Sequence, residues 1–115
     1  MMVPIEKVFL RNQQLEQNPS FQQESPFYKR VRDSIKKRGM INPLLCIQEG
    51  DRYKCCMGNN RYIAAHELGI KEVPIKIITS QVPKDLRDAT KDYIPTEVEG
   101  NPFLKREYER RKNEL

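Results

Sequence analysis

The sequence predicts an α+β fold in which a small mixed β-sheet packs against helices and a charged helix follows at the C-terminus. Segments with strand-like and helix-like spacing of apolar residues follow one another in the order strand, helix, strand, strand, helix, strand. The 115 residues are enough for one hydrophobic core and too few for two independent cores. We therefore expect one domain over residues 1–80 and a helical extension over residues 81–115.

The composition indicates a small core within a charged surface. Hydrophobic residues make up 37% of the chain, and 21 lysines and arginines against 16 acidic residues give a net charge of +5. This mildly basic balance suits a nucleic acid or nucleotide partner without requiring one. No apolar run approaches membrane-spanning length and no signal segment follows Met1, so we expect a cytoplasmic protein without a membrane partner.

The N-terminal part of the chain predicts one strand and one loop. Alternation of apolar and polar residues from Val3 to Phe9 indicates a short strand, in which Pro4 suits an edge or a first position. The stretch from Arg11 to Glu24 is rich in Gln and Asn and has almost no apolar periodicity. We interpret it as a surface loop that could become ordered against a partner.

A helix is predicted from Phe27 to Arg38. Ser25 is a suitable N-cap, Pro26 suits the first helical position, and Gly39 follows where a helix usually ends. The apolar residues that recur along it at four-residue spacing are Phe27, Val31 and Ile35.

The rest of this helix surface is strongly basic. Its cationic residues are Lys29, Arg30, Arg32, Lys36, Lys37 and Arg38. A charge run of this kind usually marks a solvated helix face. The alternative is a face that holds the phosphate backbone of nucleic acid nonspecifically. The candidates for that role are Lys29, Lys36, Lys37 and Arg38.

A β-hairpin is predicted after this helix. Residues 41–47 are almost continuously apolar, which indicates a strand buried on both faces. Residues 52–57 alternate in polarity, and the Gly-containing turn over residues 49–51 joins the two strands.

The elements after the hairpin complete the predicted sheet. A second helix begins with Asn59 or Asn60 as its cap and ends at Gly69. Residues 73–78 read as the last strand, and residues 83–93 could form a short helix.

The C-terminal residues 103–115 predict a helix that is too polar to belong to the core. Its few apolar residues are Phe103, Leu104, Tyr108 and Leu115. Such a helix packs on a partner by its narrow apolar stripe or projects as a solvated tail. A homodimer or a protein partner through residues 103–115 is the expectation that follows.

The turn between the hairpin and the second helix is a candidate anion site. A strand leads through Gly58 directly into a helix whose first turn holds Asn59, Asn60 and Arg61. The first N–H groups of a helix lack intrahelical partners and carry partial positive charge, and a guanidinium adds full charge and a bidentate donor pair. Phosphate or carboxylate would be the natural ligand. The simpler alternative is a turn, a helix cap and a solvent-exposed arginine.

The residues give no support for metal-dependent or nucleophilic catalysis. Zinc needs about four regularly spaced ligands, whereas the chain has one histidine, three cysteines and no CxxC pair. His66 has no nucleophile near it in sequence, the carboxylates lie in helix faces and turns, and no Walker-type P-loop is present. We expect no catalytic residue and no metal site. The cysteines that we expect to stay reduced are Cys46, Cys55 and Cys56.

Several short motifs occur together and in order along the chain. They are Asp33 to Gly39, Asn42 to Leu45, Tyr53 to Arg61, Ala64 to Gly69 and Val73 to Ile75. Together they resemble the N-terminal domain of ParB-type partition proteins, whose fold is shared with sulfiredoxin. The resemblance covers roughly residues 2 to 79, and it is specific because separate motifs coincide.

The resemblance implies a nucleotide-binding site. In this superfamily a Gly-x-x-Arg turn before a helix holds the phosphates of a nucleotide, CTP in the partition proteins and ATP in sulfiredoxin. The preceding helix offers a hydroxyl, and a Pro-containing element borders the nucleotide. The implied ligand is therefore CTP or ATP with Mg²⁺. The residues at the matching positions are Gly58, Asn59, Asn60, Arg61, Ser34, Arg30 and Asn42.

The departures from the family pattern argue for binding rather than catalysis. Asn59 stands where sulfiredoxin has its catalytic cysteine, so sulfinic-acid reductase activity is not expected. Partition proteins usually read Gly-Glu-Arg-Arg at the turn, so Asn59 and Asn60 replace groups that help to organise metal–nucleotide binding and hydrolysis. The residues after Thr79 are too few for the family's helix-turn-helix DNA-binding domain.

The expected function is a stand-alone nucleotide- or phosphate-binding module, of the type found in phages and mobile elements. It would act in DNA transactions such as partition, regulation or phage DNA processing. We expect Arg61→Ala to abolish nucleotide binding and to leave the fold intact. One alternative is a non-catalytic interaction module with a vestigial nucleotide site. The other is a ParB-like nuclease or phosphotransferase, against which the missing carboxylate at Asn59 argues.

Overall fold

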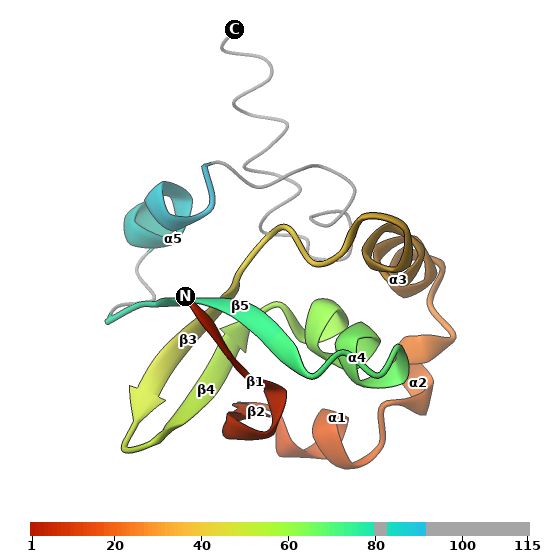
Figure 1. The fold of residues 1–115 in the computed structure, drawn as a ribbon, viewed down its shortest axis with the longest axis horizontal. Coiled ribbons are helices and arrows are strands. Elements are labelled where there is room, and N and C mark those ends of the chain that lie inside the picture. The colour runs from red at the N-terminus through yellow and green to blue at the C-terminus, as the bar shows by residue number, and fades with distance from the viewer. Residues whose placement is uncertain (80–82, 92–115) are drawn as a thin grey trace, which may run out of the picture.

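A mixed five-stranded sheet forms the centre of the computed structural model, which describes residues 1–79 and 83–91 (Figure 1). The strands are β1 (Met2–Pro4), β2 (Val8–Leu10), β3 (Leu44–Glu49), β4 (Arg52–Met57) and β5 (Glu72–Ile77). The α-helices are α1 (Gln13–Gln17), α2 (Ser20–Gln23), α3 (Pro26–Arg38), α4 (Asn59–Glu67) and α5 (Pro83–Ala89). The predicted α+β architecture is confirmed. The helix expected over residues 103–115 lies outside the described residues.

The strand pairing confirms the predicted hairpin and the mixed character of the sheet. β3 and β4 pair antiparallel around the turn that holds Gly50, and β1 pairs antiparallel with β5. β2 pairs parallel with β4, and β3 pairs parallel with β5. Parallel neighbours need a long connection, and the chain between β4 and β5 supplies one through α4.

The two edge strands of the sheet are neighbours in sequence. The strand order is β1-β5-β3-β4-β2, although only the 3-10 turn η1 (Ile5–Lys7) separates β1 from β2. The chain from Pro4 to Val8 spans at most about 14 Å, whereas the edges of a flat sheet of this size are about 19 Å apart. The sheet must therefore curl. The single strand expected from Val3 to Phe9 is wrong, because the alternation continues across η1 and gives no sign of the break.

The polar stretch after β2 forms two short helices, so the surface loop expected from Arg11 to Glu24 is wrong. Asn12 caps α1, since its Oδ1 accepts a hydrogen bond from the N–H of Leu15 at 3.1 Å. Glu16 reaches back to the sheet, where its Oε1 accepts from the N–H of Leu10 at 3.3 Å. These hydrogen bonds order residues 11–24. They involve polar side chains, so the spacing of apolar residues could not predict them.

Helix α3 begins and ends as predicted, but its buried face differs by one residue. Pro26 occupies the first turn and Gly39 follows the last one. Tyr28 and Val31 are fully buried, whereas Phe27 is 43% exposed. The buried stripe therefore begins at Tyr28 and not at Phe27, which is equally compatible with helical spacing. The stripe consists of Tyr28, Val31 and Ile35.

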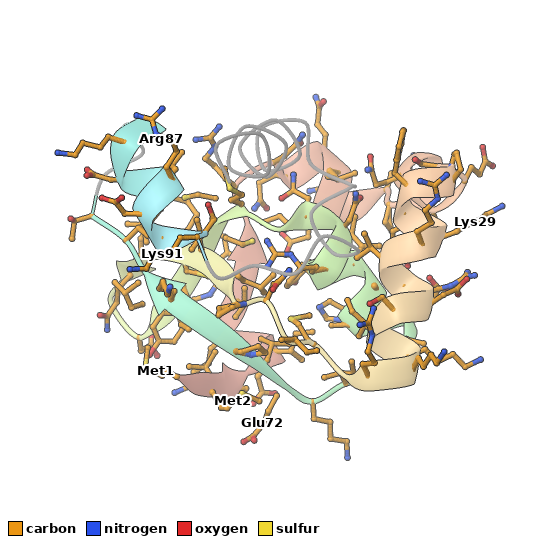
Figure 2. All side chains as sticks on the ribbon, turned by 90° about the horizontal axis from the view of Figure 1, so that it is seen from above. Met1, Met2, Lys29, Glu72, Arg87 and Lys91 are labelled. Carbon is orange, nitrogen blue, oxygen red and sulfur yellow. The ribbon has the colours of Figure 1, made fainter. Side chains whose placement is uncertain are left out.

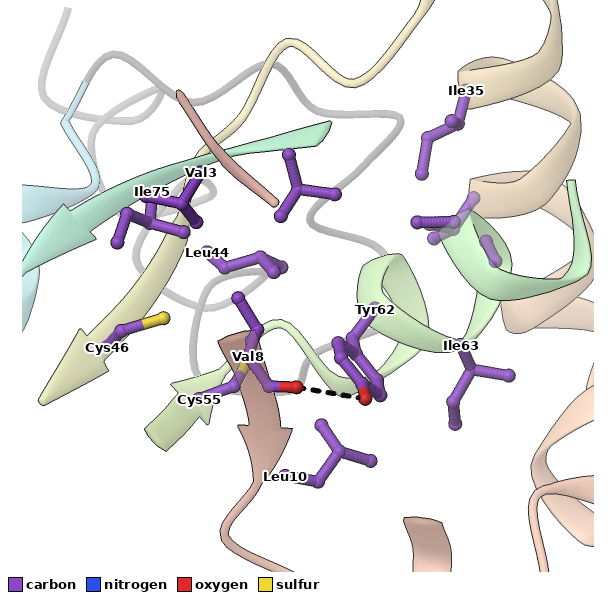
Figure 3. Packing of buried hydrophobic residues seen from close by; sticks show 14 of the residues in the cluster. Val3, Val8, Leu10, Ile35, Leu44, Cys46, Cys55, Tyr62, Ile63 and Ile75 are labelled. Atoms are coloured by element: carbon purple, nitrogen blue, oxygen red, sulfur yellow. Dashed lines mark hydrogen bonds between the residues drawn. The ribbon is translucent and has the colours of Figure 1, made fainter. Parts of the chain in front are cut away.

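The main core lies between the sheet and the pair α3 and α4 (Figure 3). Leu44 of β3 belongs to it, whereas the next residue, Leu45, packs in a second cluster on the other face with Leu86 of α5. This alternation confirms that β3 is buried on both faces. Tyr62 crosses the main core from α4 to β2, and its hydroxyl lies 3.2 Å from the carbonyl oxygen of Val8 (Figure 3).

Helix α4 ends as predicted and begins one residue earlier. Gly58 is its N-cap and Asn59 is already helical, so the expected cap at Asn59 or Asn60 is wrong. At the other end, Gly69 has a positive φ of 71°, and Ile70 donates its N–H to the carbonyl of Ala65 at 2.9 Å. This is the Schellman pattern that a glycine after the last turn favours.

Candidate functional site

The turn from β4 into α4 requires glycine at Gly58. The φ of Gly58 is +118°, which residues with a Cβ rarely adopt. A Cβ here would lie 2.7 Å from Cδ2 of Leu44 and 2.9 Å from Nη2 of Arg61. The backbone therefore passes closer to β3 and to the first turn of α4 than another residue would permit.

Arg61 is buried beneath this turn, only 2% exposed. Its Nη1 donates to the carbonyl oxygens of Asn42 at 2.8 Å and of Pro43 at 2.6 Å. The solvent-exposed arginine of the simpler alternative is therefore wrong. Because Arg61 joins α4 to the segment before β3, we no longer expect Arg61→Ala to leave the fold intact.

Both ends of α4 are held by contacts to α3 or to the segments that flank it. The first half of α3 meets the end of α4, where the hydroxyl of Tyr28 donates to Glu67 and Nη1 of Arg32 lies 3.4 Å from Glu67 Oε1. The start of α4 contacts the segment that follows α3, through Arg61 and Asn42.

Ser34 lies on the last part of α3 and faces the interior. It is 8% exposed, and its hydroxyl oxygen accepts a hydrogen bond from Nη2 of Arg38 at 3.2 Å. A hydroxyl and a guanidinium thus occur together on the last turns of α3. The sequence suggested Ser34 for this place and assigned Arg38 only to the nucleic-acid face, although Arg38 follows Ser34 by one helical turn.

The start of α4 offers backbone N–H groups at Asn59 and Asn60. Among residues 1–79 and 83–91, no side chain caps this end of the helix, and α-helical geometry gives its first N–H groups no intrahelical acceptor. Asn60 is 7% exposed, and its Oδ1 accepts a hydrogen bond from Nε2 of Gln22 in α2. Gln22 was not predicted here, because it lies in the polar stretch that has no periodic signal.

Of the two remaining residues that were predicted for the site, Asn42 lies at the turn and Arg30 does not. Asn42 is 1% exposed and meets Arg61 through its main-chain carbonyl. Arg30 is exposed, and its guanidinium lies 5.7 Å from the ring centroid of Phe27 on its own helix. The structure thus brings Asn42 to the turn as a backbone support, and it places Arg30 on the outer part of α3.

Two tyrosines fix α4 against its neighbours through carboxylates. Tyr28 bonds to Glu67, and the hydroxyl of Tyr62 lies 3.0 Å from Oε1 of Glu16. Burial and then the hydrogen bond to the carboxylate raise the pKa of both tyrosines. Both hydroxyls therefore remain protonated donors at neutral pH.

The outer face of α3 is basic. Lys29 extends away from the body of the protein, and Arg32 is held by Asp33 at 3.1 Å and by Glu67 (Figure 2). The exposed cations of this face are Lys29, Arg30, Lys36, Lys37 and Arg38. Apart from Arg38, which bonds to the inward-facing Ser34, they lie away from the buried stripe. This arrangement is expected of a solvated helix face and also of a phosphate-backbone face.

The next features are the metal-binding, histidine and cysteine side chains of the described residues 1–79 and 83–91. They include no group of three or more metal-binding side chains, and His66 is exposed, with its ring edge-on to Tyr62 at 4.7 Å. Cys46 and Cys55 face each other across β3 and β4 as buried free thiols. Their mutual hydrogen bond and then burial raise the pKa of Cys55, which keeps it unreactive.

No helix within the part of the chain that the structure describes is long and apolar enough to cross a membrane.

A curled mixed sheet with a glycine turn into the N-terminus of a helix defines a small α+β domain. The model of the ParB N-terminal domain family matches residues 2–92, and the chain belongs to this family. The family assignment confirms the resemblance drawn from the sequence motifs.

The relatives found in sequence are partition proteins. The chain is 42% identical over 60 residues to the chromosome-partitioning protein Spo0J of Thermus thermophilus, which covers 52% of this chain and 20% of that protein. The chain thus spans about a fifth of the length of the curated relatives that it matches first.

Solved structures share the fold. Sulfiredoxin from Arabidopsis thaliana superimposes with a TM-score of 0.55 at 26% identity, over 77% of this chain and 96% of that one. ParB from Caulobacter crescentus, truncated at its C-terminus and complexed with CTP-gamma-S, gives 0.54 at 19% identity, over 82% and 52%. The predicted ParB/sulfiredoxin-like fold is confirmed.

Proposed function

We propose that this chain is a ParB-like nucleotide- or phosphate-binding module that acts in DNA transactions by binding rather than by catalysis. The observation that carries the proposal is the Gly58 turn. It opens α4 with no side-chain cap from the described residues, and the guanidinium of Arg61 is buried beneath it. Anions are stabilised at such a helix start by N–H donors and by the helix dipole.

The phosphates would lie between the start of α4 and the last turns of α3. The N–H groups of Asn59 and Asn60 would donate from one side, and the hydroxyl of Ser34 and the guanidinium of Arg38 from the other. Arg61 would add positive potential from below while its Nη1 remains on the two carbonyls. The ParB of Caulobacter crescentus that shares this fold was solved with CTP-gamma-S, and a nucleoside triphosphate is our proposed ligand.

Magnesium would reach this site with the nucleotide. When bound, Mg²⁺ would neutralise phosphate charge. The turn itself offers two asparagines where partition proteins usually have Glu and Arg, and amides are weaker partners for a hard cation than carboxylates. For this reason we propose that the module holds a nucleotide and turns it over slowly or not at all.

DNA is the proposed macromolecular partner. The exposed lysines of α3 would contact phosphates without reading base sequence, because their side chains end in point charges that neutralise the DNA backbone. The candidates are Lys29, Lys36, Lys37 and Arg38. We propose a cytoplasmic setting, such as a phage or mobile element inside its host, where DNA and nucleotides are both available.

Calorimetric titration of the chain with CTP, ATP, GTP and UTP, each with Mg²⁺, tests the nucleotide proposal. At least one should bind, and Ser34→Ala should weaken it by about tenfold because a hydroxyl donor to phosphate is lost. Ser20→Ala is the matched control, since Ser20 is exposed on α2 and bonds only locally to Asn18. Absence of binding by every nucleotide would contradict the proposal.

A second candidate function follows from the hydrogen bonds within the turn. Asn60 already bonds to Gln22, and Arg61 already bonds to two carbonyls, as in a site that has become part of the fold. The chain would then be an interaction module, with residues 103–115 as the contact to a second copy or another protein. Removing residues 103–115 should then convert an oligomer to a monomer or abolish partner binding. An unchanged oligomeric state together with unchanged partner binding would contradict this second function.

A further inference from the structure

A cavity of about 370 Å³ lies between the α1–α2 segment and α4. Its α4 side is formed by the second half of that helix, whereas the phosphate site proposed above uses the first turn. The volume is at the lower end of the range of small-molecule pockets. Residues that line it include Glu16, Pro19, Tyr62, Ile63, His66 and Glu67.

The lining carries negative charge on a chain whose net charge is +5. Its acidic groups are Glu16 and Glu67, and no lysine or arginine is among the described residues that line it. Glu67 is partly neutralised by Arg32, whose Nη1 lies 3.4 Å from its Oε1. Glu16 forms no ion pair with a lysine or arginine of residues 1–79 and 83–91. The cavity therefore favours a positively charged group, and Glu16 is the stronger of the two partners.

Glu16 is also held in place before any ligand arrives. Its Oε1 lies within hydrogen-bonding distance of the N–H of Leu10, at 3.3 Å, and of the hydroxyl of Tyr62, at 3.0 Å. Its Oε2 accepts no hydrogen bond from the residues that the structure describes, so one carboxylate oxygen stays available while the other fixes the side chain. A preorganised acceptor of this kind binds a charged donor without first having to be ordered.

The rest of the lining suits a hydrocarbon stem. Ile63 and Pro19 are apolar, and the rings of Tyr62 and His66 pack edge to face at 4.7 Å. A metal ion does not fit, because the described residues contain no group of three or more metal-binding side chains. A cation on an alkyl chain, as in the side chains of arginine and lysine, would pair its charge with the carboxylate and pack its stem against the apolar lining.

We propose that this cavity binds an alkylguanidinium or alkylammonium group, with Glu16 as its ion partner. Two sources supply this chemistry: a small free amine, or an arginine or lysine side chain presented by a partner protein. In the second case the cavity would be the anchoring pocket of an interface, because a desolvated arginine in a closed pocket contributes much of the affinity at such sites.

Binding of three probes distinguishes these sources. The probes are agmatine, a blocked pentapeptide with arginine between glycines, and the same peptide with citrulline in place of arginine. The arginine peptide and agmatine should bind at micromolar to millimolar concentration, measured by amide shifts in NMR spectra, and the citrulline peptide should not, because it lacks the charge. Tighter binding of the peptide would indicate a protein partner, and equal binding would indicate a free amine.

Glu16→Gln tests the assigned partner. Glutamine keeps an Oε1 acceptor for Leu10 and Tyr62, so the fold should survive, while affinity for the arginine peptide should fall at least about tenfold with the loss of the charge. Glu24→Gln, an exposed change at the end of α2, should leave affinity unchanged. No binding of either cationic probe, equal binding of the citrulline peptide, or an unaffected Glu16→Gln variant would each overturn the proposal.

Discussion

The guanidinium of Arg61 donates to the main-chain carbonyl of Asn42 at 2.8 Å, and both residues are almost completely buried. This contact joins the first turn of α4 to the segment that follows α3. Arg61 therefore stabilises the fold and also places a positive charge beneath the Gly58 turn. A charged group in the interior persists only when its hydrogen bonds are made, which the carbonyls of Asn42 and Pro43 provide.

Arg61→Ala should destabilise the protein substantially. The change removes the guanidinium that donates to the buried carbonyl of Asn42 and the partly buried carbonyl of Pro43, and it opens a cavity. We therefore expect a loss of about 2–4 kcal/mol in the free energy of unfolding. Urea denaturation measures it. Lys71→Ala, an exposed cation in the loop before β5, should change stability by less than about 0.5 kcal/mol. A similarly small loss for Arg61→Ala would show that its burial is not needed for folding.

Gly58→Ala should cost more than the same change at another glycine with positive φ. Both Gly58 and Gly50 would incur a backbone penalty of about 1–2 kcal/mol. Only at Gly58 does the new Cβ also meet the fully buried Leu44, at 2.7 Å, which should add about 1–3 kcal/mol. Nothing lies within 4 Å of a Cβ at Gly50. Equal midpoints in urea denaturation for the two variants would contradict this close approach.

Stability should fall when the pH rises above about 10. The pKa of Tyr28 and of Tyr62 is raised in the folded protein, so above the ordinary tyrosine value of 10.0 the unfolded chain loses protons that the folded chain still holds. Their contribution is complete below that pH and is lost as the pH rises toward the folded values.

The double variant Tyr28→Phe, Tyr62→Phe separates this effect from general alkaline denaturation. It removes both hydroxyls and keeps both rings, so the variant should be less stable than the original protein at pH 7. Its stability should also depend less on pH between about 9 and 11, the range in which tyrosine titrates. Melting temperatures measured across this range provide the comparison. An unchanged slope would mean that other groups control the alkaline transition.

DNA binding should depend on α3 and on salt concentration. Each lysine that contacts a phosphate contributes about 0.9 to the slope of log affinity against log salt, so Lys36→Gln with Lys37→Gln should reduce that slope by up to about 1.8. The control is Lys84→Gln with Lys91→Gln, which removes the same charge at α5, far from α3 in Figure 2. Fluorescence anisotropy with duplex DNA at several salt concentrations measures both. If the slope fell equally in both variants, the effect would come from net charge alone and not from α3.

The sequence predicted the elements that carry their own local signals. Ser25, Pro26 and Gly39 bound α3, and the alternation of residues 52–57 defined β4, because caps and periodicity act within a few residues. The break between β1 and β2 and the helices of residues 13–23 depend on pairing with distant strands and on hydrogen bonds such as that of Glu16 to Leu10. No short window of sequence contains those partners.

For the candidate site, the sequence pointed to the glycine and the arginine of the turn but not to their geometry. The Gly-x-x-Arg pattern identified Gly58 and Arg61, because a glycine before a helix is a local feature. The burial of Arg61 and its bonds to the segment at Asn42 arise from the packing of α4 against a segment far away in sequence. The cavity beside Glu16 likewise combines α1 with the end of α4, and no motif marked it.

A nitrogen-15 NMR spectrum of the chain, recorded with and without CTP or ATP and Mg²⁺, tests the proposed function most directly. If the Gly58 turn holds phosphate, the amide signals of Asn59 and Asn60 should shift most, together with that of Ser34, because hydrogen bonds to phosphate change the shielding of those groups. The Glu16→Gln variant should respond to nucleotide in the same way. Nucleotide that leaves the amides of the turn unchanged would contradict the account.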